Sequence, residues 1–430
     1  MTKSPTHSTL KKLALDAAAA TLVVFTLAWL VGLLPFQFGV FEPVREVLAD
    51  FSYTDLYYSD LHVKQVSTPQ LDSINKDIVL VNIGARSLRG RAELAAVLRA
   101  VATCQPRVVG LDAYFLPRID SANAALAAAI GQVPRIVVGA FLPSRRARPH
   151  PSPTQPELAT VPHGFLNFKG DDSLNTTIRH FRPFIHAADT VYLSWSAELV
   201  KRYDTAAYAL LCRRHPSATA EEEEIRYQGN VQSFQHLEAT ELLDGSLPPA
   251  AMRNHLNGKL VLLGAMGEQA GQLSPTDTYE DRFFTPLNEK RMGRTRPDMY
   301  GVVIEANIVA MLLQKKYVNA TPKWLEWALG VVICFGLIFL FSFVAERFPL
   351  WYIPLNRIAQ FLILLILVYV VVQVYAHYSR TIDITLSLAA LALVGDAVAL
   401  YEALRDSIRN GWRWTRRKLL HRRKSIPQNA

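Results

Sequence analysis

The stretch GKLVLLGAMGEQ, residues 258–269, decides the fold together with EDRFFTPLN (280–288) and PDMYGVVIEANIVAMLL (297–313). A short apolar run that follows Gly-Lys and closes on Gly264 predicts a buried strand. The middle stretch lies in a long polar connection. Gly301 then opens a predicted helix whose apolar residues are spaced to pack on that strand. Strand, connection and helix together indicate an α/β unit.

The sequence upstream alternates between strand and helix patterns. Apolar runs at 77–83, 107–112 and 135–141 predict strands. The segment 91–104 carries apolar residues at helical spacing, and 123–130 predicts a shorter helix. Because short connections join strand to helix to strand, we expect a mainly parallel sheet with right-handed crossovers.

Two parts of this pattern resemble the CHASE2 domain, the extracytoplasmic sensor module of bacterial membrane proteins. The closing half matches in its strand, in the D…TP pattern of residues 281–286, and in a helix that reads G…AN from Gly301. The opening half matches in the strand at 78–83, the turn at 86–88 and the segment 109–115. The resemblance covers roughly residues 50–320. It implies a sensory α/β domain followed by three transmembrane helices.

The composition favours a membrane protein. Half of the 430 residues are hydrophobic and the mean hydropathy is +0.13, which is too apolar for an ordinary soluble enzyme. Apolar runs predict one N-terminal transmembrane helix at 13–35 and three C-terminal ones within 323–404, at about 325–345, 358–375 and 382–404. A cleaved signal peptide is the alternative for the first run. The length of the run and the bulky residues after it favour an uncleaved anchor.

Positive charge marks three segments that we expect on one side of the membrane. Residues 1–12 hold three lysines, the connection between the second and third spans holds Arg347 and Arg357, and the tail 405–430 holds nine lysines and arginines. By the positive-inside rule both termini are cytoplasmic, and residues 36–322 form a periplasmic or otherwise extracytoplasmic domain. The predicted location is the cell inner membrane, crossed by four helices.

Candidate ligand-binding residues lie where predicted strands end, because open parallel sheets bind ligands at that edge. Asp112 follows the second strand, and Gly264 closes the late one. Asp112 either contacts a ligand or only binds neighbouring backbone amides. Arg91 begins the first predicted helix of the domain. Its side chain either binds an anion or is simply solvated. Asp281 and Thr285 anchor the polar connection or contact a ligand.

Two aspartates fall within predicted spans. Asp396 lies in the last span, about eight residues before its inner end, where a carboxylate is costly and usually has a partner. It is either a protonated, hydrogen-bonded side chain or part of a paired, signalling or ion-linked site. Asp16 or Lys12, at the matching end of the first span, is the expected partner.

Several kinds of chemistry are not expected from the sequence. The histidines and cysteines lack metal-ligand spacing, and the glycines after 264 match neither a dinucleotide fingerprint nor a P-loop. We therefore expect no metal, no cofactor and no catalytic residues. A folded basic face for nucleic acid is also missing, because the net charge of +9 is concentrated in the tail.

We interpret the chain as an integral membrane sensor or signal-transduction protein, on the strength of the resemblance. The 26 residues after Leu404 are too few for an output enzyme, so we expect no enzymatic activity and a separate membrane or cytoplasmic output partner. The lipid bilayer, an extracytoplasmic ligand and an envelope protein are further expected partners, and a homodimer is left open. The alternatives are a structural or assembly scaffold of the cell envelope, or a membrane transporter built on Asp396 and Asp16.

Overall fold

The chain divides into an α/β unit and a helical unit. The computed structural model describes residues 7–33, 52–58, 74–88, 90–117, 119–142, 156–168, 177–187, 190–216, 221–270, 281–288, 296–347, 352–385, 387, 388, 390, 391, 394, 401, 405 and 407. The α/β unit is Arg45–Val318, and the helical unit combines Met1–Val44 with Asn319–Ala430.

A six-stranded sheet forms the centre of the α/β unit. Its order is β4 (His163–Phe165), β3 (Ile136–Ala140), β2 (Val108–Leu111), β10 (Leu260–Gly264), β1 (Asn75–Asn82) and β9 (Phe234–Glu238). Every neighbouring pair is parallel, which confirms the predicted mainly parallel α/β sheet. The late strand β10 lies between β1 and β2, so Leu262 pairs with both Leu80 and Gly110.

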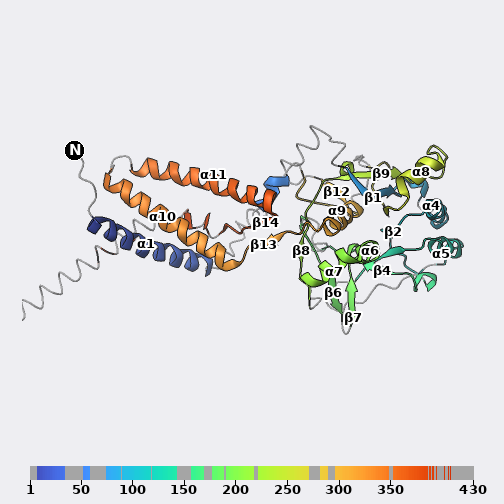
Figure 1. Ribbon diagram of the computed structural model, residues 1–430, viewed down its shortest axis with the longest axis horizontal. Helices are drawn as coiled ribbons and strands as arrows, with labels where there is room; N and C mark the ends of the chain where they lie inside the picture. The colour runs from blue at the N-terminus through green and yellow to red at the C-terminus, as the bar shows by residue number, and fades with distance from the viewer. Residues whose placement is uncertain are drawn as a thin grey trace, which may run out of the picture. The chain divides into compact units, whose positions relative to one another are not determined.

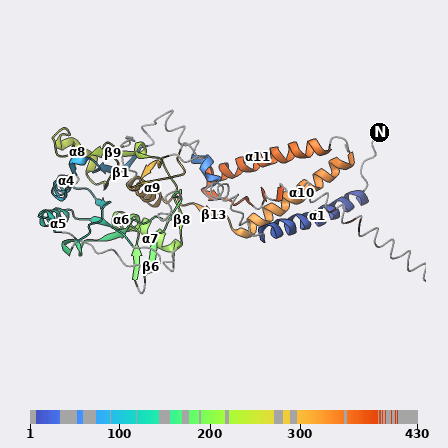
Figure 2. The same cartoon turned by 180° about the vertical axis from the view of Figure 1, so that it is seen from behind.

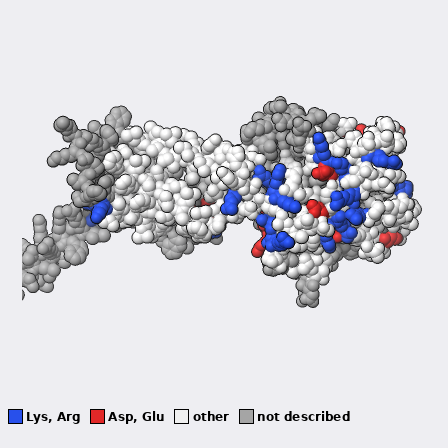
Figure 3. Space-filling view, in the orientation of Figure 1, with Lys and Arg blue, Asp and Glu red and all other residues white. Residues whose placement is uncertain are grey.

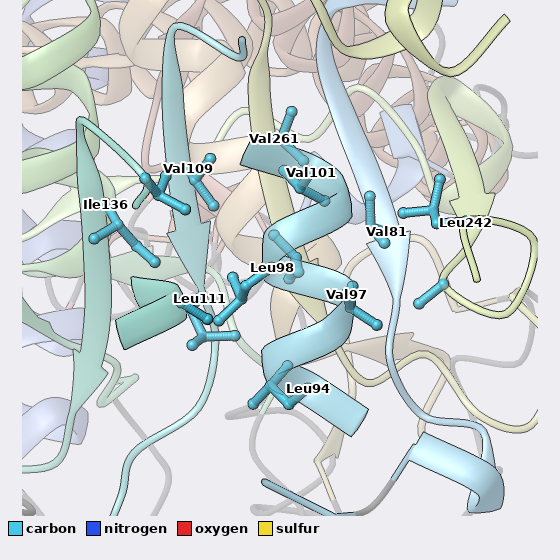
Figure 4. Close-up of a cluster of buried hydrophobic side chains, with 14 of the residues drawn as sticks. Val81, Leu94, Val97, Leu98, Val101, Val109, Leu111, Ile136, Leu242 and Val261 are labelled. Carbon is cyan, nitrogen blue, oxygen red and sulfur yellow. The ribbon is translucent and has the colours of Figure 1, made fainter. Parts of the chain in front are cut away.

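Helices cover both faces of the sheet, which explains why β1, β2 and β10 read as continuous apolar runs. The helices α4 (Arg91–Thr103), α5 (Asn123–Gly131) and α8 (Pro249–Leu256) lie on one side of the strands, and α6 (Trp195–Tyr203) and α9 (Gly301–Gln314) on the other (Figures 1 and 2). On the first face Val81, Val109, Leu111, Val261 and the β3 residue Ile136 share one apolar cluster with α4 (Figure 4). On the second face, a Cβ at Gly110 would collide with Trp195 of α6.

Smaller elements complete the α/β unit. The helix α7 (Thr205–Arg214) follows α6, and three antiparallel pairs form away from the main sheet. These pairs are β5 (His180–Phe181) with β8 (Glu223–Glu224), β6 (Phe184–Ala187) with β7 (Thr190–Leu193), and β11 (Arg282–Phe283) with β12 (Met299–Tyr300).

The helical unit contains α1 (His7–Leu33), α10 (Lys323–Arg347) and α11 (Tyr352–Tyr378). The described residues from 385 to 407 that follow are helical as well. Apolar side chains of α1 and α10 share a core with Ala390, Leu391 and Val394. A two-stranded parallel pair, β13 (Asn319–Ala320) with β14 (Arg380–Thr381), joins the segment before α10 to the segment after α11.

Two described helices are long and apolar enough to cross a membrane, namely 323–344 within α10 and 354–378 within α11. We expected four spans, and these two correspond to the second and third. The helix α1 covers most of the first expected span, 13–35, but is not among the two, and much of the fourth, 382–404, lies outside the described residues.

The surface of these two helices fits a lipid environment. Apolar side chains such as Val332 (66% exposed) and Phe361 (61%) point outward, and the visible face of the helical unit carries few charges (Figure 3). By contrast, the similarly apolar α9 is buried from Gly301 to Leu312. An apolar helix with an exposed apolar face suits lipid better than water.

Candidate functional site

The candidate site lies at the carboxyl edge of the parallel sheet. The loops that leave this edge form the usual binding crevice of such sheets. Asn82 ends β1, Glu238 ends β9 and Asp112 follows β2. Glu305 approaches from α9, and its charge acts on Asp112. The edge therefore collects polar groups from four separate elements.

Glu305 is the most enclosed carboxyl group of this site. It is 3% exposed and lies on the fully buried part of α9. The Ser196 hydroxyl, on α6, donates a hydrogen bond to Glu305 Oε2. Burial raises the pKa of Glu305 to about 8, the Ser196 bond works against that rise, and the Asp281 carboxylate adds to it. Glu305 therefore titrates near neutral pH.

Asp112 interacts electrostatically with Glu305. Its backbone N–H donates to the Leu263 carbonyl at 2.8 Å, which fixes it beside the end of β10. As a whole residue Asp112 is partly buried. Burial first and the Glu305 carboxylate second raise the pKa of Asp112 to about 7. Besides burial, the groups that shift these two pKa values are the carboxylates of Glu305 and Asp281 and the hydroxyl of Ser196. Among the described residues, no cation contributes to either shift.

Asp281 supplies a third carboxylate at the start of α9. Its backbone has φ of 61°, a left-handed conformation that Asp and Asn tolerate. Its carbonyl accepts the Gly301 N–H at 3.1 Å. The carboxylate lies over Gly301, because a Cβ added there would be 2.7 Å from Asp281 Oδ1. This explains why glycine begins the helix.

Asn82 holds the loops of this edge together, a role that our sequence analysis missed. Its Oδ1 accepts from the N–H groups of Gly84 at 2.9 Å and Met266 at 2.8 Å. Its Nδ2 donates to Glu238 Oε2 at 2.8 Å and to the Gly267 carbonyl at 3.1 Å. An Asn at the end of a buried strand was the available signal, since a buried amide needs such partners.

Thr285 serves the polar connection. Its N–H donates to Asp298 Oδ1 at 2.9 Å and its hydroxyl to Asp298 Oδ2 at 2.5 Å. Burial raises the pKa of Asp298 to about 6, although the Thr285 bonds oppose the rise. These contacts hold the segment before β12 and support the anchoring interpretation of Thr285.

Arg91 is buried and engaged by the protein itself. Its guanidinium donates to Asn123 Oδ1 and to the Leu116 carbonyl at 3.1 Å, and it lies 5.7 Å from the centre of the Phe115 ring. Arg91 thus ties the start of α4 to the loop after β2. The observed contacts favour this structural role over an anion site.

Gly264 permits the close packing of α9 on β10. A Cβ at Gly264 would be 2.5 Å from the Val302 Cβ, closer than real Cβ atoms approach. The three heavy atoms nearest to that Cβ all belong to Val302, and none belongs to the strand-to-loop turn. The structure places the obstruction on the facing helix instead.

Asp16 has partners near the other end of the sequence. Within the helical unit, the Tyr401 hydroxyl donates to Asp16 Oδ1 at 2.8 Å and Arg405 Nη1 lies 3.2 Å from Oδ2. Asp396, which we expected beside Asp16, lies outside the described residues. The contacts to Asp16 join α1 to the helical residues that follow β14.

The arrangement at the sheet edge suits proton binding and hydrogen bonding. Across the described parts of the chain, no three His, Cys, Asp or Glu side chains converge as a metal site. The five ligand-binding candidates divide accordingly. Asp112 and Asp281 each interact electrostatically with Glu305, Gly264 faces the same helix, and Arg91 and Thr285 hold loops.

Comparison with known proteins identifies the family. The family model of the CHASE2 domain matches residues 21–344, from within α1 to within α10. No curated protein and no solved structure matches the chain. The family match covers well over half of the 430 residues and agrees with the strand, loop and helix pattern at 258–313. The chain belongs to the CHASE2 domain family.

Proposed function

We propose that this protein is a membrane-embedded sensor whose extracytoplasmic CHASE2 domain acts on a separate output partner through its transmembrane helices. The family is a sensor-type extracellular one, which supports a sensory role. The observation that carries the proposal is the short covalent connection between the site helix and a candidate membrane span. The buried helix α9, which contributes Glu305 to the site, ends at Gln314, and the candidate span in α10 begins at Lys323.

The segment between these helices is well suited to transmit a displacement. Lys315 ends α9 in a left-handed conformation, and β13 pairs with β14 directly after α11. The Asn319 N–H donates to the Ser379 carbonyl at 2.9 Å, and the Thr321 N–H to the Thr381 carbonyl at 3.0 Å. A shift of α9 along its axis would therefore pull on both candidate spans.

Aromatic and basic residues support a membrane placement of these helices. Trp324, Trp327 and Tyr378 are exposed at the ends of the two spans that the β13–β14 pair joins, as expected for side chains at a membrane interface. The basic segments 1–12 and 405–430 support cytoplasmic termini and four crossings of a bacterial inner membrane. The domain then faces the periplasm or the cell exterior.

The test recovers partners from native membranes with the full chain at fixed pH. Proteins that copurify with wild type are compared with those from Glu305→Gln, and Glu93→Gln, an exposed residue of α4, is the matched control. We expect Glu305→Gln to change the amount of at least one cytoplasmic or membrane interactor while insertion stays normal. An identical interactor set in all three samples would contradict sensing through this site. Interactors that bind regardless of the site would instead favour the envelope scaffold.

A further inference from the structure

The buried carboxyl pair at the sheet edge indicates which signal the domain reads. Glu305 is 3% exposed, whereas Asp112 as a whole residue is only partly buried, so Asp112 is the more accessible of the two residues. The two groups come from different elements, the end of β2 and the helix α9. Ionisation of both places like charges where the helix packs on the sheet, which opposes that packing.

Within the described residues, no cation forms an ion pair with Glu305. From α6, the Ser196 hydroxyl faces it, while Glu198 of the same helix binds Lys201 and Arg202. From α7, Arg214 is held by Glu223.

Two cations near α9 are engaged by other groups. Arg282, over the Tyr300 ring, donates to the Pro297 carbonyl at 3.0 Å. Arg226, whose backbone N–H donates to Met311 Sδ, lies over the Tyr57 ring. From the segment before β12 comes Asp298, which binds Thr285. The Tyr227 hydroxyl donates to the Ile178 carbonyl. Burial is the main cause that raises the pKa of Tyr227, and the Glu305 charge is a further cause of that rise. The end of β10 offers only Gly264, and that of β1 only the neutral Asn82.

We propose that the proton is a ligand of this domain, bound by the Asp112–Glu305 pair, and that its release loosens α9 from the sheet. This inference rests on the proposed sensory function and names its signal. Below neutral pH the pair is protonated and α9 is docked. As the pH rises the pair loses protons, and the start of α9, next to the Asp281 carboxylate, separates from the end of β2.

The direction follows from linkage. The pKa values of both carboxyls are raised in the folded domain, to about 7 for Asp112 and about 8 for Glu305. The docked state therefore holds more protons than an opened state with ordinary carboxyls, so docking is fully favoured at low pH and weakens as the pH rises toward 8. Each proton released changes the opening equilibrium by up to about tenfold per pH unit.

The experiment measures hydrogen exchange of 301–314 in the full chain, held in nanodiscs, from about pH 6 to about pH 9. Protection factors remove the effect of pH on the intrinsic exchange rate. We expect wild-type protection of α9 to fall by tenfold or more over this range and Glu93→Gln to follow it. Glu305→Gln should lose most of the fall. A wild type without a transition, or an unchanged transition in Glu305→Gln, would overturn the proposal.

Two milder variants test the assignment without removing the carboxyl. Ser196→Ala deletes the bond that lowers the pKa of Glu305, so the transition should move to higher pH. Asp281→Asn deletes a charge that raises it, so the transition should move to lower pH, and Asn tolerates the left-handed backbone at 281. Transitions that coincide with wild type in both variants would assign the pH response elsewhere.

The readouts keep this inference separate from the proposed function. Exchange at α9 needs no partner, and partner recovery is scored at one pH. A site variant that alters partner recovery while wild-type α9 shows no pH transition would overturn proton sensing alone. A pH transition at α9 with an unaltered interactor set would overturn the output proposal alone.

Discussion

Two buried polar residues at the sheet edge, Asn82 and Glu305, differ in how the protein accommodates a polar group away from water. Asn82 is neutral and forms four hydrogen bonds, with the loops after β1 and β10 and with Glu238 at the end of β9, so it satisfies its amide without any change of charge. Glu305 has one hydroxyl donor and two carboxyl neighbours. A carboxyl in that setting is accommodated by holding its proton. Asn82 therefore stabilises the edge at every pH, whereas Glu305 makes its stability depend on pH.

A glycine substitution tests the contact between α9 and the sheet. Gly264→Ala should destabilise the α/β unit by about 1–3 kcal/mol, because the new Cβ would be 2.5 Å from that of Val302 and neither backbone can easily retreat. Gly264→Val should destabilise it further. The measurement is the thermal midpoint of the full chain in detergent.

Gly131→Ala is the matched control for that experiment. Gly131 is the last residue of α5, and no heavy atom lies within 4 Å of an added Cβ. The control should leave the midpoint unchanged or raise it, since alanine favours helix. Equal midpoints for Gly264→Ala and Gly131→Ala would show that α9 does not press on β10 as described.

At the scale of elements, local patterns predicted the strands and helices that are strongly periodic. The expected strands at 77–83, 107–112 and 135–141 correspond to β1, β2 and β3, and the expected helix at 91–104 corresponds to α4. We did not predict β9 or α8. The insertion of β10 between β1 and β2 was not predicted either, because it depends on pairing between residues about 150–180 positions apart, for which no local pattern exists.

The site was predictable only where it depends on strand ends. Asp112 and Gly264 follow from the rule that parallel strands end on one edge. The pairing of Asp112 with Glu305 depends on which face of α9 meets the sheet, and α9 is buried nearly all round, so its apolar pattern does not define that face. Arg91 and Thr285 lie at the expected ends of elements, but their partners Asn123 and Asp298 come from segments that only the fold brings near.

The left-handed residue that ends α9, Lys315, can be tested by substitution. Lys315 has φ of 57°, and its N–H donates to the Leu312 carbonyl at 3.2 Å. Glycine adopts this conformation without strain. Lys315→Gly should therefore stabilise α9 by about 0.5–1 kcal/mol, seen as slower hydrogen exchange of 301–314. Lys315→Ala, which removes the same side chain but keeps the strain, is the control. Exchange as fast in Lys315→Gly as in Lys315→Ala would contradict this cap.

For the whole molecule, the decisive property is how the chain passes between its two units. It enters the α/β unit at Arg45 and leaves it at Val318, so the helical unit contains sequence from both sides of the domain. Asp16 of α1 binds Tyr401 and Arg405 within that unit. A domain movement thus has two covalent routes into the helices, one through the segment after α1 and one through the segment before α10.

The number of crossings decides which side receives that movement, and three fusions determine it. A reporter that fluoresces only in the cytoplasm is fused after residue 160, 350 or 430, and immunoblots confirm equal amounts of each fusion. With four spans we expect no signal at 160 and a signal at both 350 and 430, because the basic segments 1–12 and 405–430 stay inside. If α1, α10 and α11 were the only spans, the signal at 430 would be lost. If α1 did not cross while the N-terminus stayed inside, the signal would appear at 160 and disappear at 350. A signal at 160 would place the CHASE2 domain in the cytoplasm, and the proton proposed here would then be a cytoplasmic one.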